Sequence, residues 1–242
     1  MARSALAGLG ALALAGLLLA GCASTTSGTS ASSPEPATEE TATPDPDLGA
    51  AWLDNGNMIG LVTLGSSTCV PVAEEATYTD GTLNVTLAAP AASTPCTSDL
   101  VPRVTLVSVP KGVDASKNLP IEVSGDQYLG QVELPGVSGL TGTGETDYNP
   151  SAGWATVQGQ FVILTWGSSS CPPVIQDVAA TGPAEVTVTY ETPAANQVCT
   201  MDMAPRAAVA AVNDLEETTG VSAILTGDAF DNVKIPIYGT NA

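Results

Sequence analysis

The sequence predicts an all-β protein in which one small domain occurs twice. Residues 65–72 (GSSTCVPV) return 102 residues later as 167–174 (GSSSCPPV), and residues 96–103 (CTSDLVPR) return 103 residues later as 199–206 (CTMDMAPR). Apolar and polar residues alternate within each copy, which is typical of half-buried strands. We therefore expect two tandem small antiparallel β-sandwich or open-barrel domains, each with one internal disulfide, after a disordered tether.

The strands are predicted from alternation and from β-branched content. Residues 83–87 (LNVTL) and 186–190 (VTVTY) alternate in both copies, and residues 207–217 are rich in Ala and Glu, which favour a helix. The repeat nevertheless favours a strand there, because its counterpart at 104–109 is β-branched and ends at a proline. Further strands are expected at 59–64, 161–166, 121–123 and 132–134 and near Ile224 and Ile235.

The repeat also sets the expected domain boundaries. The first copy covers 49–136, a connector covers 137–153, and the second copy covers 154–242. Trp52 and Trp154 each lie 17 residues before the first Cys of their copy. We interpret them as packing residues, because large aromatic side chains are scarce in this chain, with stacking on carbohydrate as the alternative.

The N-terminus has the features of an export signal. One basic residue, Arg3, precedes an apolar run at 5–20 that is too short to span a bilayer comfortably. The run ends in LAGC at 19–22, which resembles the bacterial lipobox. That resemblance implies that residues 1–21 are a lipoprotein signal peptide, that Cys22 carries the lipid, and that the chain is held on the outer face of the cell membrane by two acyl chains.

Residues 22–48 are predicted to be the lipidated Cys and a tether. This segment is rich in Ser, Thr, Pro and Glu and contains no aromatic residue, so it cannot bury enough apolar surface to fold. As a coil it would span about 25 to 30 Å, and the β domains would stand off the membrane.

Four cysteines remain once Cys22 is assigned to the lipid, and three pairings are open. A duplicated domain was once a single stable unit, so we expect Cys69 to pair with Cys96 and Cys171 with Cys199. Each bridge closes a loop that is worth roughly 3.5 kcal/mol in the chain-entropy model. Redox catalysis is disfavoured because no Cys-x-x-Cys occurs, and zinc because the cysteines are widely spaced and the chain has no His. We expect no metal and no cofactor.

One acid and one base recur after the second Cys of each copy. Arg103 and Arg206, the two Arg residues beyond the signal peptide, each follow an Asp by four residues, at Asp99 and Asp202. We predict that each Arg pairs with this Asp or with a carbonyl oxygen and holds the segment on the sheet. Binding of an anionic ligand by each Arg is the alternative.

Composition argues against several functions. The chain has 25 acidic and 6 basic residues, a net charge of −19, and we therefore expect no nucleic-acid partner. It lacks His, and its GSSxC segments lack the second Gly of a nucleophile elbow, so we predict no catalytic residue. Adjacent Glu74 and Glu75 lie in what we predict to be a polar loop, where they are poorly placed as a catalytic pair.

The pairing of WGSSSCP at 166–172 with CTxDxxP looks like a pattern in uncharacterised actinobacterial lipoproteins, and the resemblance implies no activity. Our hypothesis is a non-enzymatic binding or structural lipoprotein, with an envelope protein or glycan as partner besides the membrane. The alternative is a carboxylate-based hydrolase of envelope glycan or peptide, which requires two carboxyl groups in one cleft. Solute delivery to a transporter is disfavoured, because such proteins are larger hinged α/β chains.

Overall fold

The computed structural model describes residues 45, 47–125, 128–142 and 145–241, which belong to one compact unit. The predicted signal peptide, the lipidation site Cys22 and nearly all of the predicted tether lie outside the described residues. Within the described part, no helix is both long enough and apolar enough to cross a membrane.

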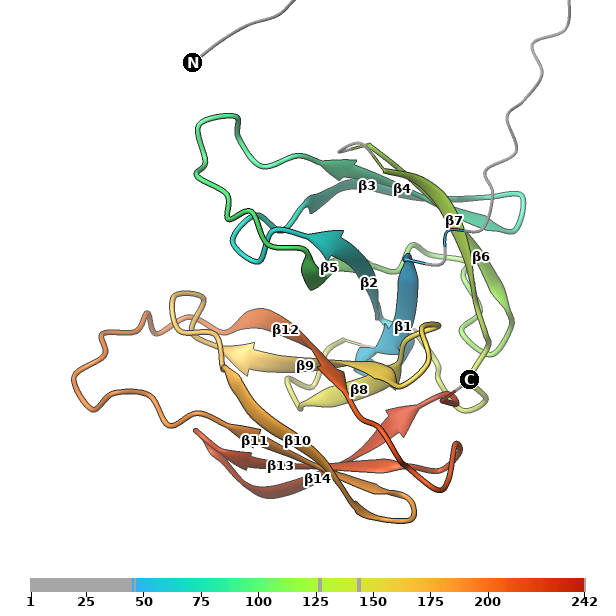
Figure 1. Ribbon diagram of the computed structural model, residues 1–242. Helices are drawn as coiled ribbons and strands as arrows, with labels where there is room; N and C mark the ends of the chain where they lie inside the picture. Colours follow the sequence, from blue (N-terminus) through green and yellow to red (C-terminus); the bar gives the residue numbers. More distant parts are fainter. Residues whose placement is uncertain (1–44, 46, 126–127, 143–144, 242) are drawn as a thin grey trace, which may run out of the picture. The chain divides into compact units, whose positions relative to one another are not determined.

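The described chain folds into strands and one short 3₁₀ helix, which confirms the all-β prediction (Figure 1). The first copy contains β1 (Gly49–Leu53), the 3₁₀ turn η1 (Asp54–Gly56), β2 (Met58–Gly65), β3 (Val72–Thr79), β4 (Thr82–Ala88), β5 (Val101–Ser108), β6 (Leu119–Gly125) and β7 (Tyr128–Leu134). The second copy contains β8 (Ser151–Trp154), β9 (Gln160–Gly167), β10 (Ile175–Gly182), β11 (Glu185–Tyr190), β12 (Ala204–Ala211), β13 (Ser222–Gly227) and β14 (Phe230–Tyr238).

Both copies arrange their strands in the same spatial order. The second copy forms one sheet in the order β10-β11-β13-β14-β8-β9-β12, and the first copy forms the equivalent sheets β3-β4-β6-β7 and β1-β2-β5. The pairing is not antiparallel throughout, as we had expected, because β4 pairs with β6 and β11 with β13 in parallel. The chain leaves β4 for β5 in the other sheet before it returns as β6, and such a crossover permits a parallel pair where a hairpin would not.

The alternating segments form the cores as predicted. Leu83, Val85 and Leu87 on β4 are buried, as are Val186 and Tyr190 on β11. The predicted strand at 207–217 is β12, which pairs with β9 along its whole length and ends at Ala211. Tertiary pairing therefore overrides the helix propensity of this Ala-rich segment.

Four strands, β1, β3, β8 and β10, were not predicted, and the expectation of a polar loop at Glu74 and Glu75 is wrong. Glu74 and Glu75 lie in β3, next to an irregularity in its pairing with β4, and not in a polar loop. The strand is held in a hairpin by Asp80 and Gly81, which both adopt positive φ as a type I′ turn requires. A strand with polar residues on both faces carries little of the alternation that identified its neighbours.

The two copies share a core. Buried Leu53 and Val62 of the first copy cluster with Val162 and Leu164 of the second. The backbone N–H of Thr156 donates to the carbonyl oxygen of Ala50 at 3.1 Å, which ties the start of one copy to the other. The two repeats therefore pack on each other through an apolar interface and are not independent domains.

Candidate functional site

Each copy carries a disulfide that joins a Gly-Ser-Ser turn to a long loop. Cys69 is bonded to Cys96 and Cys171 to Cys199, with Cα atoms 5.5 and 5.6 Å apart. The predicted disulfides are therefore confirmed. The turn follows β2 or β9, and the loop precedes β5 or β12. These four segments are the disulfide loops: 66–71, 89–100, 168–174 and 191–203.

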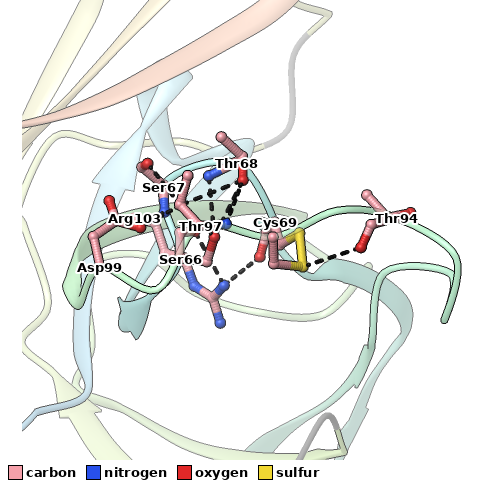
Figure 2. The surroundings of a disulfide bond; sticks show 9 residues. Ser66, Ser67, Thr68, Cys69, Thr94, Thr97, Asp99 and Arg103 are labelled. Atoms are coloured by element: carbon pink, nitrogen blue, oxygen red, sulfur yellow. Dashed lines mark hydrogen bonds between the residues drawn. A yellow bond between two sulfur atoms is a disulfide. The ribbon is translucent and has the colours of Figure 1, made fainter.

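Hydrogen bonds fix the disulfide loops of the first copy (Figure 2). The N–H of Thr97 donates to the hydroxyl of Thr68 at 3.1 Å, and the hydroxyls of Ser66 and Thr97 lie 2.8 Å apart. Asp99 accepts from the Thr97 hydroxyl and from the Ser67 N–H, the latter at 3.2 Å. Asp99 thus caps the Gly-Ser-Ser turn from the opposite loop.

The second copy repeats this network. Thr200 N–H donates to the Ser170 hydroxyl at 3.0 Å, and Asp202 accepts from the Ser169 N–H at 3.0 Å and from the Thr200 hydroxyl. The bond from the Thr97 hydroxyl, and next that from Ser67, lowers the pKa of Asp99 from 3.8 to about 2, and the equivalent bonds lower the pKa of Asp202. Both carboxylates are ionised caps at neutral pH.

We predicted that each Arg contacts the nearby Asp or a carbonyl oxygen, and the contact with a carbonyl oxygen is found in both copies. Arg206 donates to the carbonyl oxygens of Cys171 at 3.1 Å and Trp166 at 3.0 Å. Arg103 donates to the carbonyl oxygens of Ser66 and Cys69 and to the Tyr128 hydroxyl. The alternative that we had named, a bond to a carbonyl, holds the segment on the sheet.

A glycine makes room for each guanidinium. A Cβ on Gly65 would lie 2.4 Å from Cζ of Arg103, and one on Gly167 would lie 2.8 Å from Cζ of Arg206. The repeated Gly therefore allows the Arg to cross the strand end and reach the Cys carbonyl. The Gly at this position in both repeats is the sequence feature that could have indicated binding of the Arg to a carbonyl oxygen.

Exposed apolar side chains gather on the disulfide loops and their edges. Of nine large apolar side chains that are exposed in the described residues, seven lie there. They are Val70, Val72 and Leu100 in the first copy and Val174, Val198, Met201 and Met203 in the second. Leu100 is 72% exposed and Val198 is 91% exposed. We call these seven side chains the disulfide-loop surface.

The disulfide loops of both copies lie at the same end of the unit. Both long loops project to the left in Figure 1, at the ends of β4 and β11. Leu100 and Met203 directly precede β5 and β12, two strands that contact each other across the junction of the copies. Exposed apolar side chains of both repeats therefore lie at this end of the unit.

A cavity of about 450 Å³ opens beside the Cys171–Cys199 bridge. Its walls include Trp166 and three prolines, Pro172, Pro173 and Pro193. The charged groups that line it are Glu191, Arg206 and Asp228. The cavity is thus amphipathic, with apolar walls and a net negative lining.

The described residues also form other cavities. One of about 240 Å³ lies between Trp52 and Trp154, which are 2% and 4% exposed and pack as predicted. Another of about 110 Å³ is lined by Asp54, Glu145 and Asp147.

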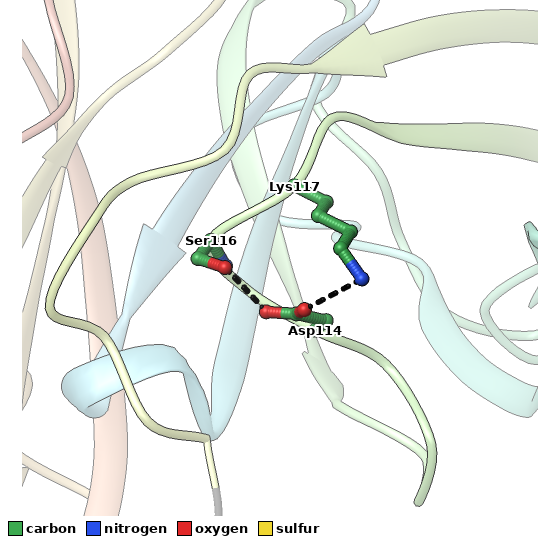
Figure 3. Close-up of polar contacts among 3 residues, drawn as sticks. All are labelled: Asp114, Ser116 and Lys117. Atoms are coloured by element: carbon green, nitrogen blue, oxygen red, sulfur yellow. Dashed lines mark hydrogen bonds and ion pairs between the residues drawn. The ribbon is translucent and has the colours of Figure 1, made fainter.

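Asp114, which does not line these cavities, closes a loop through its own contacts. Asp114 forms an ion pair with Lys117 at 3.0 Å and accepts from the Ser116 hydroxyl at 2.6 Å (Figure 3). These contacts, the Ser116 bond first, lower the pKa of Asp114 to about 2 and close the turn between β5 and β6. In the described part of the chain, no group of three or more His, Cys, Asp or Glu side chains is placed to hold a metal ion.

Comparisons with protein-family models, with curated proteins and with solved structures give no match to this chain.

Proposed function

We propose that the protein is a lipid-anchored, non-enzymatic binding protein of the cell envelope that contacts a partner through the disulfide-loop surface. The observation that carries the proposal is the concentration of exposed apolar side chains on equivalent loops of the two repeats. Single exposed apolar residues are ordinary, but a contiguous group of them is typical of an interaction surface. The disulfides and the Arg bonds support this role, because they hold the loops in one conformation before binding.

The N-terminal features support the same proposal. A lipid on Cys22 and a Pro- and Thr-rich tether would keep the folded unit at the outer membrane face while leaving its surface accessible. The partner in this proposal is an envelope protein. An envelope glycan is the alternative partner.

The test uses the full chain immobilised through its N-terminus and solubilised envelope proteins. We expect Leu100→Ser and Met203→Ser each to lower retention of the same proteins by several-fold. Leu129→Ser is the matched control, because Leu129 is 68% exposed and lies outside the disulfide-loop surface. Equal retention by all three variants would contradict the proposal.

A second candidate function is a carboxylate-based hydrolase, favoured by the joint presence of Asp54, Glu145 and Asp147 around one cavity. The cavity of about 110 Å³ is smaller than the few hundred Å³ of ordinary ligand pockets. Hydrogen bonding to Asn149 lowers the pKa of Asp147, which makes it a poorer general acid. Turnover of a glycan, peptide or ester substrate that is lost in Asp54→Asn would establish this function in place of binding.

A further inference from the structure

Building on the proposed function, we infer that the partner is a protein segment that carries apolar side chains and a basic side chain. The cavity beside Cys171–Cys199 receives the basic side chain, and the exposed Met and Val side chains of the disulfide loops contact the apolar ones.

The charge of the surface selects the partner. Asp99, Asp202 and Glu191 on the disulfide loops are exposed, and no Lys lies on these loops. Lys111 and Lys117 lie between β5 and β6, and Lys234 lies on β14. An exposed apolar surface edged by carboxylates attracts a basic segment and repels an acidic one. A second copy of this chain, with its net charge of −19, is accordingly disfavoured as the occupant.

The cavity suits a Lys or Arg side chain. The aliphatic stem of such a side chain packs on apolar walls while its charged end seeks carboxylates. Here Pro172 and Pro193 supply apolar wall, and Glu191 and Asp228 supply carboxylates. Arg206 also lines the cavity, but it donates to two backbone carbonyl oxygens and is therefore held against the strand.

The turn that carries Asp228 has a constrained backbone. Asp228 has φ of +48° in the turn between β13 and β14. The preceding Gly227 lies so close to β11 that a Cβ there would be 2.2 Å from the carbonyl oxygen of Tyr190. Asn tolerates the same backbone conformation, so Asp228→Asn removes the charge without straining the turn.

The experiment measures binding of labelled octapeptides to the full chain by fluorescence anisotropy at low salt. The probes are blocked peptides of alternating Lys and Val, Ser and Val, and Glu and Val. We expect the Lys-Val peptide to bind most tightly, and Glu191→Gln with Asp228→Asn to weaken it by roughly 5-fold to 10-fold, as for a partly desolvated ion pair. The same variant should leave Ser-Val binding unchanged.

Controls separate this inference from the proposed function. Glu122→Gln removes an exposed charge from β6, so a loss equal to that of Glu191→Gln with Asp228→Asn would show unspecific attraction and overturn the inference. If Ser-Val binds as tightly as Lys-Val, and Met203→Ser weakens both, the inference fails and the proposed function stands. If Met203→Ser and Leu129→Ser leave every peptide equally bound, the proposed function fails as well.

Discussion

Two polar residues, one Asp and one Arg, fix the disulfide loops in each repeat. Asp99 and Asp202 cap the Gly-Ser-Ser turns, and Arg103 and Arg206 bind the carbonyl oxygens of Cys69 and Cys171. These contacts connect the two sides of each disulfide independently of the sulfur atoms. The disulfide, the Asp cap and the Arg bonds therefore all fix the backbone of these loops, which carry the exposed apolar side chains.

The first prediction concerns the titration of Asp99. Its pKa is lowered by the Thr97 hydroxyl, so the stabilising effect is fully present above pH 3.8 and is lost as the pH falls toward about 2. Thr97→Val removes the largest cause, and the pKa of Asp99 should rise toward its ordinary value in a carboxyl ¹³C NMR titration. Thr200→Val acts on Asp202 in the other repeat and should leave Asp99 unchanged. An unaltered Asp99 pKa in Thr97→Val would refute this account of the cap.

The repeated positions of Asp and Arg were sufficient to predict that these residues have a structural task, but not which groups they bind. An Asp and an Arg four residues apart could form a pair in a regular segment. Here the carboxylate turns toward Ser67 and the guanidinium crosses over Gly65. Which contact forms depends on the path of the backbone through the turn, and the local sequence specifies that path only through the Gly.

Strands are the level at which sequence prediction succeeded best. Alternation identified β4 and β11, because one face of each is buried and the other is not. The repeat identified β12 against its helix propensity. The repeat did not identify β3 and β10, which lack fully buried residues, or β1 and β8, which are short and buried throughout and so show no alternation. The parallel pairs were also missed, because strand order in a crossover depends on contacts remote in sequence.

The second prediction concerns the loops as elements. Replacing Cys69 and Cys96 together by Ala should lower the free energy of unfolding by roughly 3.5 kcal/mol in the chain-entropy model. Urea unfolding followed by Trp fluorescence measures this value. Because the repeats share a core, we expect a single cooperative transition in the variant, as in the parent protein. A variant with unchanged stability would show that the hydrogen-bond network alone holds the loop.

The whole unit depends on the junction between the repeats. Sequence predicted two domains but gave no information on their orientation. The junction is formed by β1 and β5 of the first copy against β8, β9 and β12 of the second, and buried side chains of β2 and β9 join the shared cluster. A strand that is buried on both faces has a continuous apolar sequence, which does not reveal what packs on either face. Packing the repeats together places the disulfide loops of both repeats at one end of the unit.

The third prediction tests this junction. A Cβ on Gly153 would lie 2.2 Å from the carbonyl oxygen of Trp52 in the other repeat. Gly153→Ala should therefore destabilise the protein by about 1 to 3 kcal/mol, as overpacking does in well-packed cores. In Gly182→Ala the new Cβ meets the side chain of Glu185 at 3.4 Å, so this control should remain near the parent in thermal unfolding. Equal melting temperatures of the two variants would contradict the shared core.

The most direct test of the binding account is site-specific photo-cross-linking in the native envelope. p-Benzoylphenylalanine is placed at Leu100, Met203 or Leu129, all of which are exposed. If the two repeats form one surface, positions 100 and 203 should cross-link the same protein, and position 129 should not. Cross-linking from position 129 as strong as from the other two, or none from positions 100 and 203, would contradict the account.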